Sequence, residues 1–125
     1  MDSNQTCPCG SGNTYGTCCQ PLIDNRAQAQ SPEQLMRSRY TAYVHRDLPY
    51  IRKTWHHDHC PRDLSLEGLP DFIRLQIISH EMSDKQGQVH FRAFYHDQGE
   101  LTWMEERSDF VKLSERWFYT TGRVE

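Results

Sequence analysis

Four cysteines lie close together near the start of the chain, at Cys7, Cys9, Cys18 and Cys19. Four thiolates can close a tetrahedron around one Zn²⁺ ion. Disulfides are the alternative, but a bridge between the adjacent Cys18 and Cys19 is strained, and one between Cys7 and Cys9 closes a very tight ring. The spacing therefore predicts a zinc site. Because four protein ligands leave no open coordination position, we expect this site to be structural rather than catalytic.

The segment around these cysteines is poor in apolar residues. Gly10, Gly12 and Gly16 allow the positive-φ turns that a short metal loop requires, and nearby N–H groups can donate to the sulfurs. Residues 1–24 cannot fold by burial alone and need a metal to hold them. We expect Cys9→Ser to unfold this segment and to leave residues 31–125 largely intact.

Size and charge exclude several classes of protein. The chain has 125 residues, a formal net charge of -3 and no long basic run, so bulk charge does not favour nucleic-acid binding. Single-strand binding through the aromatic residues and Arg37, Arg39 and Arg92 ranks last, because the sequence shows no basic groove. No stretch reaches the ~20 apolar residues that a membrane span needs, and the first residues do not resemble a secretion signal. We therefore expect a cytoplasmic protein, and in that reducing compartment thiols favour metal over disulfides.

The rest of the sequence predicts two helices followed by four strands. Ser31, Pro32 and Gln34 predict the start of a helix that ends near residue 46, and Asp47 can cap a second helix that runs through Trp55. Residues 56–71 predict a loop. Strands are expected over residues 73–82, 88–96, 101–112 and 116–121. Together they predict an α+β fold in which helices pack on a curved antiparallel sheet.

The second predicted strand has two distinct faces. Val89, Phe91, Ala93 and Tyr95 alternate with a more polar set, and the apolar set should face the helices. The opposite face would carry His90, Arg92, Phe94 and His96. We expect that face to be exposed, and it is a candidate surface for forming a homodimer.

Two families of protein share these motifs. The run Cys-Pro-Cys-Gly-Ser-Gly-x-x-Tyr-x-x-Cys-Cys over residues 7–19 resembles the SEC-C zinc motif of SecA-like proteins. Residues 36–43, 54–56, 106–110 and 116–119 resemble the YchJ family. That resemblance implies a domain of the nuclear transport factor two-like, or cystatin-like, cone fold over residues 31–125, after a SEC-C segment over residues 1–24. The resemblance to SecA-like proteins implies a protein partner for the zinc motif, at the ribosome or the secretion machinery.

Cone-shaped domains of this fold often hold a pocket between the helices and the sheet. Glu106 is the best catalytic candidate, because it alternates with Met104 and Ser108 on one face of a strand. The alternative is a structural ion pair from Glu106 to Arg37 or Arg39. His56 and Tyr40 are further candidates, whereas the polar run from His56 to Cys60 reads as a solvated loop.

Two functions follow from these features. The first is a zinc-stabilised adaptor, in which the SEC-C segment meets a partner protein and the cone domain binds a small ligand. The second is an enzyme of isomerase, dehydratase or hydrolase type that uses the cone pocket. Fold alone cannot choose between them.

Overall fold

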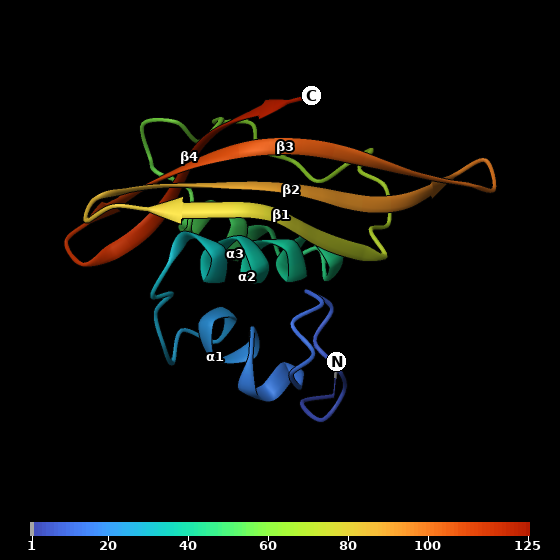
Figure 1. Ribbon diagram of the computed structural model, residues 1–125, viewed down its shortest axis with the longest axis horizontal. Coiled ribbons are helices and arrows are strands. Elements are labelled where there is room, and N and C mark those ends of the chain that lie inside the picture. The colour runs from blue at the N-terminus through green and yellow to red at the C-terminus, as the bar shows by residue number, and fades with distance from the viewer. Residues whose placement is uncertain (1) are drawn as a thin grey trace.

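A four-stranded antiparallel sheet covers one side of a helical layer in the computed structural model, which describes residues 2–125 (Figure 1). The strands are β1 (Arg74–Met82), β2 (Gln86–Asp97), β3 (Glu100–Leu113) and β4 (Arg116–Val124), paired in chain order. The helices are α1 (Gln20–Ile23), α2 (Pro32–Val44) and α3 (Leu48–Lys53), and a 3-10 turn spans Tyr15–Thr17. This arrangement confirms the predicted α+β class.

The start of α2 follows from its first residues. The Ser31 hydroxyl accepts a hydrogen bond from the Gln34 N–H at 3.1 Å, and Pro32 occupies the first turn, where no N–H is needed. The side chain of Gln34 accepts from the Gln30 N–H at 2.8 Å. Two hydrogen bonds therefore stabilise the start of α2. The second differs from a capping box, in which the Gln34 side chain would accept from the N–H of Ser31 rather than from that of Gln30.

The second helix is shorter than expected, because the residues after it pair with β4. The helix α3 ends at Lys53 rather than at Trp55. The Tyr119 N–H donates to the Thr54 carbonyl at 2.9 Å, and the His56 N–H donates to the Tyr119 carbonyl at 2.8 Å. These two bonds form an isolated parallel bridge between Trp55 and Tyr119 of β4, which excludes a further helical turn.

The two faces of β2 differ less than the alternation suggests. Val89, Phe91 and Ala93 face the helices and are buried, as expected. On the outer face, however, Phe94 is also buried, because Trp103 lies against its ring at 5.6 Å between centroids and the Arg74 guanidinium lies 5.3 Å from it. Cross-strand neighbours thus cover part of the outer face.

Charged and polar side chains cover the neighbouring part of the outer face of the sheet. The Glu105 carboxylate accepts hydrogen bonds from Arg92 Nε and from the His90 ring, each at 2.7 Å. These bonds, that of Arg92 first, lower the pKa of Glu105 to about 2. His90 is buried as a result, contrary to the expectation of an exposed face.

The cysteine segment shares the core of the rest of the chain. In Figure 1 it lies against α2 on the side away from the sheet. Cys7, Cys9 and Cys19 are buried in the same apolar cluster as Leu35 and Met36 of α2. The first cysteines and α2 are therefore packed as one unit, which changes the expected effect of Cys9→Ser.

None of the helices within residues 2–125 combines the length and the apolar character needed to cross a membrane. The longest, α2, has 13 residues.

Candidate metal centre and cavity

The four N-terminal cysteines meet at one point. The sulfur atoms of Cys7, Cys9, Cys18 and Cys19 all lie within 4.8 Å of one another, and none forms a disulfide. The Sγ atoms of Cys9 and Cys18 are 3.6 Å apart, and those of Cys18 and Cys19 are 3.9 Å apart. In a tetrahedral site with Zn–S bonds of about 2.3 Å, sulfur atoms are separated by about 3.8 Å. The spacing of the thiols therefore fits a tetrahedral metal ion.

Backbone geometry sets this spacing. The Cys7 N–H donates to the Asn13 carbonyl at 2.9 Å, and the Gly10 N–H donates to the Cys7 carbonyl at 3.2 Å. Gly10 has a φ of 81°, in the left-handed region that glycine adopts without strain. A Cβ atom at Gly10 would also lie 3.4 Å from the Leu75 carbonyl of β1. Glycine thus lets the loop turn tightly and approach the edge of the sheet.

Hydroxyl groups surround the sulfurs. Thr41 Oγ1 of α2 donates to Cys19 Sγ at 3.4 Å and lies 3.8 Å from Cys7 Sγ. Ser11 Oγ is 3.2 Å from Cys18 Sγ. Donors of this kind orient metal-bound thiolates and stabilise their negative charge.

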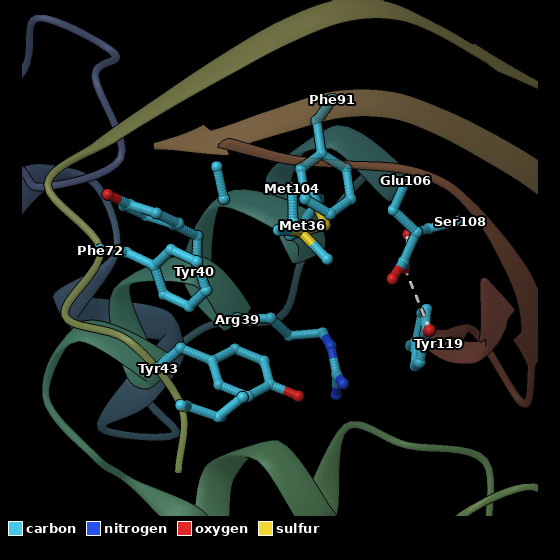
Figure 2. Close-up of a pocket in the computed structure, with 12 residues that line it drawn as sticks. Met36, Arg39, Tyr40, Tyr43, Phe72, Phe91, Met104, Glu106, Ser108 and Tyr119 are labelled. Atoms are coloured by element: carbon cyan, nitrogen blue, oxygen red, sulfur yellow. Dashed lines mark hydrogen bonds between the residues drawn. The ribbon is translucent and has the colours of Figure 1, made fainter. Parts of the chain in front are cut away.

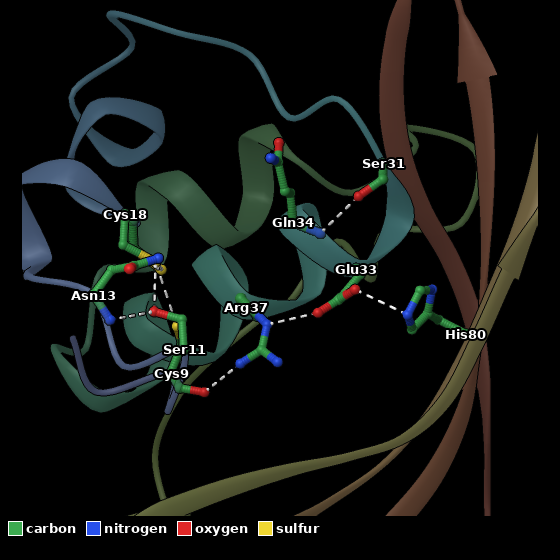
Figure 3. A network of polar contacts seen from close by, with 10 residues as sticks. Cys9, Ser11, Asn13, Cys18, Ser31, Glu33, Gln34, Arg37 and His80 are labelled. Atoms are coloured by element: carbon green, nitrogen blue, oxygen red, sulfur yellow. Dashed lines mark hydrogen bonds and ion pairs between the residues drawn. The ribbon is translucent and has the colours of Figure 1, made fainter.

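A chain of polar contacts ties this centre to α2 and to the sheet (Figure 3). Arg37 Nη1 donates to the Cys9 carbonyl at 2.7 Å, and Arg37 Nε donates to Glu33 at 3.0 Å. The other oxygen of Glu33 lies 3.0 Å from the His80 ring of β1. Arg37 thus pairs with Glu33, and the expected alternative of an ion pair to Glu106 is not formed.

The electrostatics of the cluster call for a cation. Burial raises the pKa of Cys18 to about 11, and hydrogen bonding with Cys7 and Cys9 raises that of Cys19. Hydrogen bonds from Cys19 and Cys7 lower the pKa of Cys9. Four crowded thiolates would repel one another strongly, so a soft divalent cation is what would let all four ionise together.

A cavity of about 150 Å³ lies on the other side of α2, between this helix and the concave face of the sheet (Figure 2). Its apolar walls come from α2, the sheet and the loop before β1, and they include Met36, Leu69, Phe72, Phe91, Ala93 and Met104. Its polar lining consists of Arg39, Tyr40, Tyr43, Glu106, Ser108 and Tyr119. The expected pocket between helices and sheet is therefore present.

Glu106 points into this cavity and is held by two hydroxyl groups. Its Oε2 atom accepts hydrogen bonds from Ser108 and, at 3.1 Å, from the Tyr119 hydroxyl. Burial, and after it the charge of Glu106, raises the pKa of Tyr119, so the phenol stays a donor. The alternative of an ion pair from Glu106 to Arg39 is wrong for these residues, because neutral hydroxyls take the place of the arginine.

Arg39 is a buried cation in the opposite wall, only 2% exposed. Its Nη1 atom donates to the Ile51 carbonyl at 2.9 Å and to Thr54 Oγ1 at 2.6 Å. Its guanidinium lies 4.5 Å from the centre of the Tyr119 ring and 5.1 Å from that of Trp55. Burial lowers the pKa of Arg39. Two aromatic faces, one carbonyl and one hydroxyl thus surround the guanidinium in place of a carboxylate.

The other two catalytic candidates lie in different places. Tyr40 lines the cavity, and burial raises its pKa to about 12. His56 is not among the residues that line the cavity; its Nδ1 accepts from the Asp58 N–H at 3.1 Å, and its ring stacks on His57 at 4.7 Å. The structure thus brings Tyr40 and Glu106 to one cavity and leaves His56 in the loop.

Sequence reasoning missed the residues that orient Glu106. Alternation placed Ser108 on the same face of β3 as Glu106 but did not identify it as a hydrogen-bond partner of the carboxylate. Tyr119 and Gly122 lie on β4, and their proximity depends on the strand register, in which Ser108 pairs with Gly122. A pairing shift between Ser108 and Phe110 makes that register hard to derive from sequence.

Comparison with protein families matches both parts of the chain. The model of the SEC-C motif matches residues 4–21, and that of the YchJ middle NTF2-like domain matches residues 31–122. A UPF0225 protein from Shewanella sp. (strain MR-7) is 44% identical over 136 residues, covering 98% of this chain and 82% of the relative. A UPF0225 protein from Deinococcus radiodurans is 41% identical over 113 residues, covering 90% of this chain and 85% of the relative.

Two solved structures are similar throughout. The solution structure of a SEC-C motif containing protein from Rhodopseudomonas palustris has a TM-score of 0.85 and 36% identity, covering 94% of this chain and 96% of that one. The crystal structure of a SEC-C motif containing protein from Psychrobacter arcticus has a TM-score of 0.78 and 28% identity, covering 95% of this chain and 82% of that one. The chain therefore belongs to the UPF0225, or YchJ-like, family, in which a SEC-C motif precedes an NTF2-like domain.

Proposed function

We propose that this chain is a zinc-stabilised binding protein whose cone cavity takes a small organic molecule. The observation that carries the proposal is the pair of charged side chains, Arg39 and Glu106, in the lining of a cavity with otherwise largely apolar walls. Keeping charged groups in a largely apolar cavity wall is costly, and a polar ligand that pairs with them offsets that cost. Residues 31–125 would form the binding domain.

In this proposal Zn²⁺ is held by Cys7, Cys9, Cys18 and Cys19, and residues 1–24 form the metal-binding segment. The spacing of the sulfurs and the hydroxyls of Ser11 and Thr41 support zinc. With four protein thiolates the role is structural: the ion would fix α2, the helix that also lines the cavity. A reducing, cytoplasmic compartment suits such a site.

Binding is favoured over catalysis by the state of Glu106. Its Oε2 atom already accepts two hydrogen bonds, from Ser108 and Tyr119, so this oxygen is engaged with the protein and the carboxylate is fixed in orientation. Tyr40 lines the same cavity, but within residues 2–125 its hydroxyl makes no hydrogen bond to a base. An enzyme of isomerase, dehydratase or hydrolase type is the alternative if bound molecules are converted.

Filling the cavity tests the proposal. Ala93 lies on the inner face of β2 and lines the cavity, so Ala93→Leu should occupy much of its volume. In an NMR screen of small aromatic fragments against the labelled protein, we expect Ala93→Leu to weaken binding at least tenfold. The matched control is Ala27→Leu on the exposed connector, which should change nothing. Fragments that bind both variants as they bind the wild type would count against a binding cavity.

A second function, an adaptor for a partner protein, is favoured by a groove next to the metal centre. It has a volume of about 940 Å³ and runs between the cysteine segment and α2, with Cys18, Asn13 and Gln34 in its lining. SEC-C segments in SecA-like proteins suggest the ribosome or the secretion machinery as partner. If so, Asn13→Trp should abolish co-sedimentation with purified ribosomes, and unchanged co-sedimentation would exclude this groove as the ribosome-binding site.

Self-association through the outer sheet face around Trp103 stays a prediction, which sedimentation velocity would test.

A further inference from the structure

The cavity carries a positive charge without a counter-ion. Among residues 2–125, Arg39 takes part in no ion pair with a carboxylate. Both of its hydrogen bonds to protein leave from Nη1. Figure 2 shows the guanidinium projecting into the cavity between Tyr43 and Tyr119. A guanidinium in this position is suited to a carboxylate from outside the chain, because its planar fork matches two carboxylate oxygens.

A single carboxylate lines the same cavity. Glu106 is held by Ser108 and Tyr119 through Oε2, and Figure 2 shows its side chain directed into the cavity from β3. An ionised carboxylate only accepts hydrogen bonds, so it would select a donor such as a hydroxyl or an ammonium group. It would also repel a ligand that is purely anionic.

The rest of the cavity lining is largely apolar, and the cavity is small. Met36, Phe91 and Met104 line it. Its volume of about 150 Å³ is that of an engineered apolar cavity in another protein that binds benzene. The ligand body is therefore of about the size of a six-membered ring, with room for polar groups only where the lining is polar.

We infer that the ligand is a small carboxylate with a ring-sized apolar body and a hydrogen-bond donor, its carboxylate on Arg39 and its donor on Glu106. This inference rests on the proposed binding function and adds the class of molecule. The carboxylate on the ligand matches the buried guanidinium of Arg39, and the donor matches the half-buried carboxylate of Glu106. Molecules with only one of the two groups leave the other charge in the cavity unpaired, which costs affinity.

Three probes of similar size test the inference: 4-hydroxybenzoate has both groups, benzoate lacks the donor, and phenol lacks the carboxylate. By isothermal titration calorimetry or NMR titration we expect 4-hydroxybenzoate to bind at least tenfold more tightly than either of the others. Equal affinity for the three probes would overturn the inference and leave the proposed function standing. If other fragments bind in a manner sensitive to Ala93→Leu but none of the three probes does, the ligand class is wrong. If no fragment binding depends on Ala93, both fail.

Two variants assign the groups. Glu106→Gln should tighten benzoate severalfold, because repulsion is removed, and should reduce the advantage of 4-hydroxybenzoate over benzoate to less than threefold. Arg39→Met should abolish the tighter binding of 4-hydroxybenzoate relative to phenol. If Arg39→Met does not fold, the affinities of phenol and benzoate for Arg39→Lys are compared instead. Glu105→Gln, the same change one residue earlier on the opposite face of β3, is the control and should leave all ratios as in the wild type. Unchanged ratios in Glu106→Gln would contradict the assignment of the donor site.

Discussion

Cys9→Ser should lower the free energy of unfolding of the whole chain by about 3 kcal/mol or more, because a structural zinc site contributes its binding energy to folding. Cys9 is fully buried and belongs to the same apolar cluster as Leu35 and Met36. The Cys9 carbonyl also accepts a hydrogen bond from Arg37 of α2. Loss of the metal would therefore weaken the packing of α2, and not only the N-terminal segment.

Tryptophan fluorescence during urea unfolding measures this effect cleanly. The three tryptophans, Trp55, Trp103 and Trp117, all lie outside the cysteine segment. Their transition should move to lower urea in Cys9→Ser. In Cys60→Ser, which changes the lone half-buried cysteine of the loop, the free energy of unfolding should change by less than about 0.5 kcal/mol. A tryptophan transition that is the same in Cys9→Ser and in the wild type would show that residues 1–24 fold apart from the rest.

Gly122→Ala is expected to destabilise the chain by about 1–3 kcal/mol, although alanine in an exposed strand normally stabilises relative to glycine. A Cβ atom at Gly122 would overlap the carboxylate of Glu106 and lie 2.7 Å from the Tyr119 hydroxyl. The carboxylate would have to leave, and the hydroxyls of the buried Ser108 and Tyr119 would lose their acceptor. Thermal and chemical unfolding measure the loss.

Two further variants separate this cause from a general effect on β4. Thr121→Ala, at the neighbouring exposed position, should change stability by less than about 0.5 kcal/mol. In a Glu106→Ala background the carboxylate is absent, so Gly122→Ala should cost at least about 1 kcal/mol less than in the wild type. Equal costs in the two backgrounds would mean that Gly122 does not act through Glu106.

Local sequence signals predicted most of the elements. Ser31 and Pro32 fix the start of α2 through contacts within a few residues, and the alternation of Val89, Phe91 and Ala93 assigns the inner face of β2. The thiols of the N-terminal segment are close in sequence, so their meeting could also be predicted. In each case the determining residues lie within one element or one short loop.

Contacts between distant elements could not be predicted in this way. The end of α3 depends on pairing with Tyr119, which lies more than sixty residues later. The packing of the cysteine segment on α2 depends on Arg37 reaching the Cys9 carbonyl. The same holds for Glu106, whose expected arginine partner is replaced by hydroxyls that only the register of β3 and β4 brings near.

The metal content of the purified chain tests the zinc site most directly, when elemental analysis is combined with a thiol titration before and after chelation. We expect close to one zinc ion per chain, with Cys60 the only reactive thiol at first and all five cysteines reactive after chelation. A chain that contains no metal, with its thiols either all reactive or joined as disulfides from the start, would contradict it.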